Sequence, residues 1–193
     1  MALFAQLSVI PHPAISMVQQ IRERYPGQKE REGEMTKQET YDYLNAHGIS
    51  YEVTDHPAVF NMAELAEIEL PYPEVDAKNL FVRDDKKQNY YLITVKGDKR
   101  VDLKQFRRQH GLRNLSFAGA EDLMRLLGLE AGSVTPLGLL NDEDCRVIFY
   151  LDAEFTGLIG VHPNDNTATV WMQAEDLKRL IEEHGNPVHT FCI

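Results

Sequence analysis

The chain has 193 residues, 43% of them hydrophobic, which is enough for one domain with a substantial core and too few for two large domains. Its formal net charge of −10 opposes the binding of nucleic-acid phosphates by the molecule as a whole. Two cysteines without CxxC spacing argue against a disulfide framework or a cysteine-based zinc site, and no apolar run reaches the roughly 18–20 residues of a membrane span.

Residues 1–34 differ in composition from the rest of the chain. Two prolines interrupt the apolar start, which lacks the basic residues of a secretory signal, and the polar run RYPGQKEREGE follows it. We expect an N-terminal extension that is poorly ordered, with one short helix around 15–24. The folded domain is expected to span 35–193.

Order is predicted to begin at the capping box T36-K-Q-E, and Gly48 is expected to end the helix that follows. Residues 49–54 are expected to form a strand. An N-x-x-E pattern then predicts a second short helix over 61–67, and the PYPE segment after it breaks regular structure.

The hydrophobic periodicity of the chain predicts the remaining helices and strands. In chain order these are a hairpin of strands over 78–83 and 89–95, a helix over 102–110, a strand over 115–118, a helix over 121–127, a loop or strand over 132–140, strands over 146–151 and 167–172, and a helix over 174–184. Helices and strands mix without strict alternation. The predicted class is therefore α+β, a single domain with a mixed, mostly antiparallel sheet or partial barrel flanked by helices.

Positive charge is concentrated in one window of this acidic chain. From Arg83 to Arg113 the sequence holds ten Lys and Arg residues against four acids, a local balance of +6, so the remainder is near −16. Such a belt is suited to docking a short stretch of phosphate backbone. Lysine-rich turns and helix faces that keep the protein soluble explain the same excess equally well.

Polar residues crowd the entrance to the strand over 167–172, in the run V161-H-P-N-D-N-T. His56 and His162 both precede proline, which favours an extended backbone at each histidine. Lys78 begins a predicted strand and could bind an anion as a point charge. The glycine-bounded segment 132–138 could offer backbone amides to a developing oxyanion, although its spacing alone favours a plain turn.

The segments KNLFVRD, NYYLITV, DKRVDL, LSFA, GSVTPLGLLND and HPNDNTATV occur in this order from Lys78 onward. Their order and spacing resemble the YbaK/prolyl-tRNA editing domain family, and in particular its free-standing branch that deacylates alanyl-tRNA(Pro). The resemblance covers about 36–184 and leaves the N-terminal extension outside it. It implies that Met35 could be a natural start.

The resemblance implies a site that hydrolyses the ester between an amino acid and the terminal adenosine of tRNA. Lys78 matches the family's lysine and would hold phosphate or the substrate end. The amides between Gly132 and Gly138 would face the oxyanion. His162 would line the aminoacyl pocket. Four further residues would bind substrate: Asn79, Phe60, Asn166 and Thr167.

The basic window would then dock tRNA through five side chains: Lys99, Arg100, Lys104, Arg107 and Arg108. The implied partners are the acceptor end of tRNA(Pro) and also prolyl-tRNA synthetase or an elongation factor, in the cytoplasm and without a membrane. No cofactor or metal is implied. Two alternatives stay open: a deacylase of cysteinyl-tRNA(Pro), and a module of the same fold that binds tRNA or a synthetase without hydrolysis.

Overall fold

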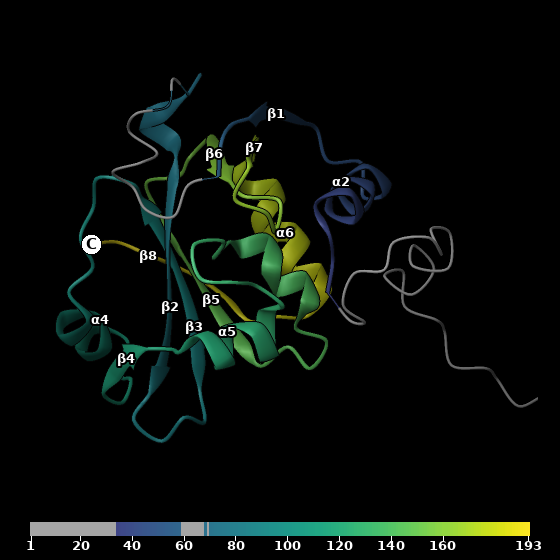
Figure 1. Cartoon of the computed structure of the whole chain (residues 1–193). Helices are drawn as coiled ribbons and strands as arrows, with labels where there is room; N and C mark the ends of the chain where they lie inside the picture. The colour runs from purple at the N-terminus through teal and green to yellow at the C-terminus, as the bar shows by residue number, and fades with distance from the viewer. Residues whose placement is uncertain (1–33, 59–67, 69) are drawn as a thin grey trace, which may run out of the picture.

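In the computed structural model of the protein, residues 34–58, 68 and 70–193 are described. Within these ranges the chain forms two separate sheets with helices packed around them (Figure 1). The predicted helices over 15–24 and 61–67, and all of the predicted extension except Glu34, lie outside the described residues. No helix within the described ranges is long and apolar enough to cross a membrane.

The smaller sheet, sheet A, has the strand order β1-β7-β6, and its neighbouring strands are antiparallel. The larger sheet, sheet B, has the order β4-β2-β3-β5-β8, in which β4, β2 and β3 pair antiparallel whereas β5 pairs parallel with β3 and β8. The strands are β1 (Tyr51–Asp55), β2 (Ala77–Asp84), β3 (Tyr90–Lys96), β4 (Leu115–Phe117), β5 (Val147–Asp152), β6 (Leu158–Val161), β7 (Ala168–Gln173) and β8 (Val188–Phe191).

The α-helices are α2 (Lys37–Ala46), α4 (Leu103–Gln109), α5 (Ala120–Leu127) and α6 (Ala174–His184), and the 3-10 helices are η1 (Pro73–Val75) and η2 (Pro136–Asn141). The capping box that was predicted before α2 is confirmed, since the Thr36 side chain accepts from Glu39 N and the Glu39 side chain accepts from Thr36 N. Left-handed glycines end α5 at Gly128 and α6 at Gly185, as the sequence pattern indicates.

The α+β class is confirmed, and neither sheet closes into a barrel within the described residues. Two strands were not predicted, β6 and β8, each only four residues long. The prediction of a loop or strand over 132–140 was wrong in its second half. Pro136 opens η2 there, because proline has the backbone angle of a first helical residue and needs no partner for an amide hydrogen.

Each face of sheet B packs against a different apolar layer. Neighbouring residues of a strand point to opposite faces, so Phe81 joins the main core and Val82 joins a second cluster beneath α4. The main core lies between sheet B and the buried faces of α5, α6, η2 and sheet A. This packing brings the start of β2 next to the end of β6.

The two sheets meet at one isolated parallel bridge between Asp76 and Gly160. Gly160 has no side chain there, and a Cβ atom at this position would lie 2.3 Å from Cζ3 of the Trp171 ring. The ring cannot easily move away. Trp171 is only 1% exposed, and its Nε1 donates a hydrogen bond of 2.9 Å to Thr54 Oγ1. Close packing of an indole on a bare backbone therefore holds the junction together.

Gly160→Ala is expected to lower the free energy of unfolding by about 1–3 kcal/mol, the usual cost of overpacking a filled core. The matched control is Gly157→Ala, because a Cβ atom at Gly157 meets no heavy atom within 4 Å. Urea unfolding of the two variants measures the difference. Equal stability of both variants would contradict the tight packing of Trp171 on Gly160.

Asp76 is an unusual group at this junction because its carboxyl is buried with little compensation. The residue is 4% exposed, and its Oδ2 atom has no hydrogen-bond partner among the described residues. Burial raises the pKa of Asp76 to about 7, and a hydrogen bond from the backbone of Ala77 opposes the shift only in part. At any pH below about 7 the folded state therefore favours the protonated, uncharged carboxyl.

Asp76→Asn is expected to stabilise the protein at pH 8. An unfolded aspartate titrates near 4 and the folded one near 7, so the folded state holds an extra proton between these values. The stability linked to this proton is complete below about pH 4 and is lost as the pH rises through 7. The variant should gain about 2–4 kcal/mol in free energy of unfolding at pH 8 and clearly less at pH 5.

Asp84→Asn supplies the matched control, since Asp84 is a second buried carboxylate with the opposite shift. Burial alone would raise the pKa of Asp84, but N–H groups of Gln88, Asn89 and Lys86 together lower it. Its removal should destabilise the protein at pH 8. Urea unfolding at pH 5 and pH 8 measures both changes in the free energy of unfolding. A loss of stability in Asp76→Asn at pH 8 would contradict the cost of burying the charged carboxylate.

Candidate functional site

Lys78 lies at the start of β2, beside the end of β3. Its Nζ donates a hydrogen bond of 3.2 Å to the Gly97 carbonyl, and the Gly97 amide donates 3.0 Å to the Asp76 carbonyl. Burial lowers the pKa of Lys78; Asp98 opposes this shift and Arg100 adds to it. Lys78 is thus a partly desolvated cation, and a second cation, Arg100, lies close enough to lower its pKa further.

Asn79 connects β2 to the segment 132–138. Its Oδ1 accepts a hydrogen bond of 2.7 Å from Thr94 Oγ1 on the neighbouring strand, and its Nδ2 donates 3.0 Å to the Val134 carbonyl. Both ends of the amide are therefore held in one orientation. Asn79 fixes the distance between Lys78 and the segment 132–138.

The segment 132–138 begins at Gly132, whose φ of 95° is a conformation that favours glycine. Thr135 is fully buried, and its Oγ1 donates a hydrogen bond of 2.6 Å to the His162 carbonyl. Gly138 lies inside η2, where its amide donates to the Thr135 carbonyl at 3.1 Å and a Cβ atom would lie 2.5 Å from Leu129 Cδ1. In this conformation Gly138 provides close packing, and its N–H is already engaged.

His162 follows β6 and is partly buried. Burial lowers the pKa of His162 to about 4; His56 adds to the lowering and Asp165 opposes it. At neutral pH the ring is uncharged. It can donate one hydrogen bond and accept another, but it cannot serve as a fixed positive charge.

Asn166 and Thr167 lie in the turn between His162 and β7, and both are partly buried. The Thr167 hydroxyl contacts Oδ1 of Asp165, and it accepts a hydrogen bond of 3.2 Å from Lys37 Nζ. Lys37 also pairs with Asp55 at 2.8 Å. Contacts from α2 and β1 thus hold the turn in place.

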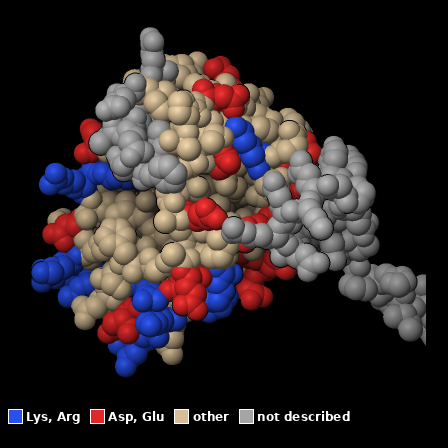
Figure 2. All heavy atoms as spheres, in the orientation of Figure 1, with Lys and Arg blue, Asp and Glu red and all other residues tan. Residues whose placement is uncertain are grey.

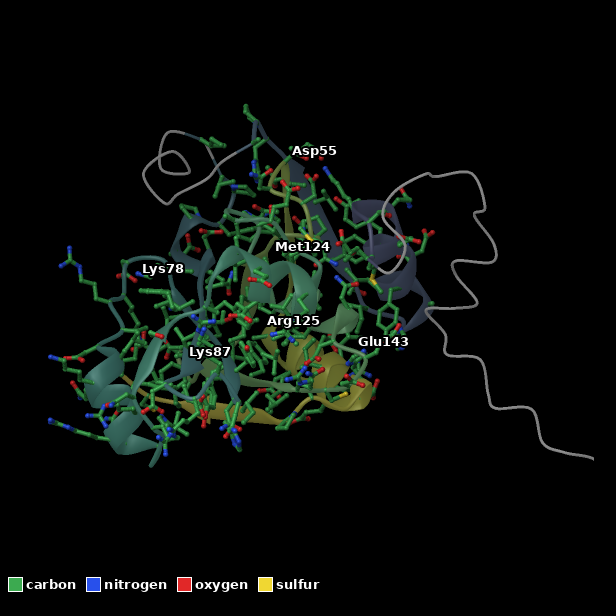
Figure 3. All side chains as sticks on the ribbon, turned by 60° about the horizontal axis from the view of Figure 1, so that its bottom comes forward. Asp55, Lys78, Lys87, Met124, Arg125 and Glu143 are labelled. Atoms are coloured by element: carbon green, nitrogen blue, oxygen red, sulfur yellow. The ribbon has the colours of Figure 1, made fainter. Side chains whose placement is uncertain are left out.

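Hydrogen bonds connect three parts of the predicted site: Asn79, the segment 132–138 and the His162 backbone. A continuous series of contacts runs from Thr94 through Asn79 and the segment 132–138 to His162. Lys78 lies at one end of β2 and is far along the hairpin from Lys87, which lies in the turn at the other end (Figure 3). Phe60 lies outside the described residues.

The predicted docking residues lie in different surroundings. Lys99 pairs with Asp152 at 2.7 Å and with Glu154 at 2.8 Å, so its charge is balanced within the protein. Arg100, Lys104, Arg107 and Arg108 form no ion pair with any other described residue. Lysine and arginine gather over the side of the molecule that carries α4, β4 and the β2–β3 turn (Figure 2).

Three positioning residues were missed by the sequence reasoning: Thr94, Thr135 and His56. Thr94 interrupts an otherwise apolar strand and is fully buried, which is a signal the pattern contained. Thr135 precedes a proline, as the two histidines do. Among the described residues, no group of three or more His, Cys, Asp or Glu side chains is placed to hold a metal ion.

Comparison with known proteins places this geometry in a family. A model of the aminoacyl-tRNA editing domain matches residues 56–180. The prolyl-tRNA editing protein ProX of Acetoanaerobium sticklandii is 36% identical over 152 residues, which cover 78% of this chain and 93% of that protein. A prolyl-tRNA synthetase associated domain-containing protein 1 of Mus musculus is 33% identical over 160 residues, covering 80% of this chain and 94% of that protein.

Solved structures share the fold at lower identity. A candidate trans-editing enzyme for prolyl-tRNA synthetase superposes with a TM-score of 0.59 at 22% identity, covering 81% of this chain and 96% of that one. A crystal structure of a hypothetical protein gives 0.59 at 19% identity, covering 79% and 97%. The region matched by the family model contains Lys78, the segment 132–138 and His162. The chain belongs to the aminoacyl-tRNA editing domain family.

Proposed function

We propose that the protein is a trans-editing hydrolase that deacylates mischarged tRNA(Pro), with alanyl-tRNA(Pro) as its substrate. The observation that carries the proposal is the hydrogen-bonded series that joins β2, the segment 132–138 and His162 in a member of the editing family. The names of its relatives, a prolyl-tRNA editing protein and prolyl-tRNA synthetase associated proteins, support the choice of tRNA.

The reaction requires water to attack the ester carbonyl while negative charge builds on the carbonyl oxygen. Lys78, with Arg100 nearby, would anchor a phosphate of the tRNA 3′ end, since two cations attract a phosphodiester more strongly than one. Backbone amides that follow Gly132 would stabilise the developing oxyanion. The 2′-hydroxyl of the terminal adenosine would help to activate the water, so the reaction needs no cofactor.

His162 would line the aminoacyl pocket as a neutral ring. A pKa of about 4 means that its imidazole carries no charge at the pH of the cytoplasm, where we place the protein. A neutral ring can accept a hydrogen bond from the substrate amine or from water. Asn166, Thr167 and Phe60 would complete this pocket, and Asn79 would act by holding the segment 132–138 in place.

Alanine and proline differ in size, so exclusion of the larger ring explains why correctly charged prolyl-tRNA would be spared. Alanine and cysteine differ only by a thiol, and one such group changes binding by about 1–3 kcal/mol. Discrimination against the cysteinyl ester would therefore be modest. The ratio of the two hydrolysis rates is a direct measure of the pocket's size.

Docking of the acceptor end would use the cations that form no ion pair with another described residue, namely Arg100, Lys104, Arg107 and Arg108. Lys99 would contribute through its ion pairs with Asp152 and Glu154, which hold the loop beside Lys78. Because the whole chain carries a net charge of −10, prolyl-tRNA synthetase or an elongation factor would help to present the tRNA.

Lys78→Ala is expected to lower kcat/KM for alanyl-tRNA(Pro) by roughly 10- to 100-fold, the loss that follows removal of one hydrogen bond to a charged group. Hydrolysis of alanyl-, cysteinyl- and prolyl-tRNA(Pro) is measured for wild type and variant. The control is Lys178→Ala, which removes a lysine from α6 and should leave the rate unchanged.

Rapid loss of the alanyl ester with survival of the prolyl ester would support the proposal. Preferential loss of the cysteinyl ester would keep the mechanism and change the substrate. Binding of tRNA without hydrolysis of any ester would instead identify a non-catalytic binding module.

Reversal of three charges on α4, Lys104→Glu, Arg107→Glu and Arg108→Glu, should raise KM for tRNA and leave kcat nearly unchanged. Each lost phosphate contact should reduce the slope of log affinity against log salt by about 0.7–0.9. Binding measured between low and high salt gives this slope. Lys178→Glu is the control for charge alone, and an unchanged slope in the triple variant would exclude α4 from the docking surface.

A further inference from the structure

A second histidine, His56, lies against His162 and has no place in the predicted set of site residues. It follows β1 directly and is 8% exposed. Its ring centroid lies 5.9 Å from that of His162, with an angle of 51° between the two ring planes. His56 therefore forms one wall of the space in which the His162 imidazole is held.

Hydrogen bonds fix the His56 ring from both sides. Nδ1 lies 2.9 Å from the Pro57 carbonyl, and Nε2 lies 3.1 Å from Thr169 Oγ1. A carbonyl oxygen can only accept, so we assign the ring hydrogen to Nδ1; Nε2 then accepts from the Thr169 hydroxyl. Both ring nitrogens are used, and rotation of the ring would break both bonds.

The backbone also holds His56 against the turn that carries His162. The amide of His56 donates a hydrogen bond of 2.9 Å to the Thr167 carbonyl, and Asp55 pairs with Ala168 in sheet A. Thr169 is fully buried on β7, so its hydroxyl approaches His56 from a rigid strand. The ring is supported by two strands of sheet A.

Charged groups from two elements and one turn of the described chain act on the two rings. His162 experiences His56 from the end of β1 and Asp165 from its own turn. Asp55 interacts with His56 and is itself paired with Lys37 on α2. With respect to the described residues, burial and His56 oppose a proton on His162, and Asp165 favours it.

We propose that His56 is a positioning residue for His162: its ring, held by Pro57 and Thr169, packs against the His162 imidazole and keeps it in one orientation. The proposal rests on the proposed function, because it assigns His56 a role in ester hydrolysis through His162. It also predicts a property of the His162 ring that can be measured without substrate.

Thr169→Val tests the positioning most directly, because valine keeps the shape of threonine and removes the hydroxyl that donates to His56. Loss of one neutral hydrogen bond should lower kcat for alanyl-tRNA(Pro) by roughly 3- to 10-fold and leave KM unchanged, since docking lies elsewhere. Thr169→Ser keeps the hydroxyl and should therefore retain most of the wild-type rate. Urea unfolding of both variants confirms that they are folded.

His56→Gln tests the contact between the two rings, because a glutamine amide can still accept from Thr169 but cannot carry the charge by which His56 lowers the pKa of His162. The pKa of His162 should rise above that of the wild type, and the acid limb of the pH–rate profile should move to higher pH with it. Nuclear magnetic resonance titration of the His162 ring, followed through its nitrogen and Cε1 shifts, measures the pKa and the tautomer in the free protein.

Two results would overturn the proposal. One is a Thr169→Val protein whose kcat equals that of Thr169→Ser. The other is a His162 ring whose titration is the same in His56→Gln as in the wild type. Absence of ester hydrolysis in the wild type would refute the proposed function alone, since the titration of His162 still decides whether His56 controls that ring.

Discussion

The contact on which the site depends is the parallel pairing of Asp76 with Gly160, where sheet B meets sheet A. Lys78 and His162 each lie two residues beyond this pair. A strand advances about 3.3 Å per residue, so each of these two residues lies within about 7 Å of the junction along its own segment. The junction has a cost, because it buries the Asp76 carboxyl with an unsatisfied oxygen. The fold thus accepts a local penalty at the point where the segments that carry Lys78 and His162 meet.

Beyond the junction, hydroxyl and amide groups determine how the site residues are spaced. Thr94, Asn79, Thr135 and Thr169 are not expected to perform chemistry, yet each one makes a hydrogen bond that orients a neighbour of Lys78 or His162. Three of them are threonines that are fully buried, where an unpaired hydroxyl would be costly. Their bonds therefore favour a single arrangement, and the series acts as a rigid frame into which an ester can be placed.

Sequence patterns predicted the parts of this frame that are local. The capping box at Thr36, the β2–β3 hairpin and α6 follow from spacing within a few residues, and all are confirmed. The strands β6 and β8, of four residues each, were missed. Hydrogen-bond partners that are distant in sequence left no pattern to find: a charge count cannot show that Lys99 pairs with Asp152, and glycine spacing cannot show that the Gly138 amide donates to Thr135. For the same reason His56 looked like one of two similar His-Pro pairs until its contact with His162 was visible.

An acidic protein can still bind RNA because electrostatic attraction is local under physiological conditions. The screening length is about 8 Å at physiological ionic strength, so phosphates that approach α4 respond mainly to cations nearby. Several basic residues of this region are neutralised internally, among them Arg83 by Asp122 and Arg113 by Asp85. Among the described residues, Arg100 and the α4 side chains Lys104, Arg107 and Arg108 form no such pair, and α4 lies in the part of the surface where basic side chains gather (Figure 2). In the proposed docking mode the acidic remainder would serve specificity, because it would oppose RNA on the parts of the surface away from these cations.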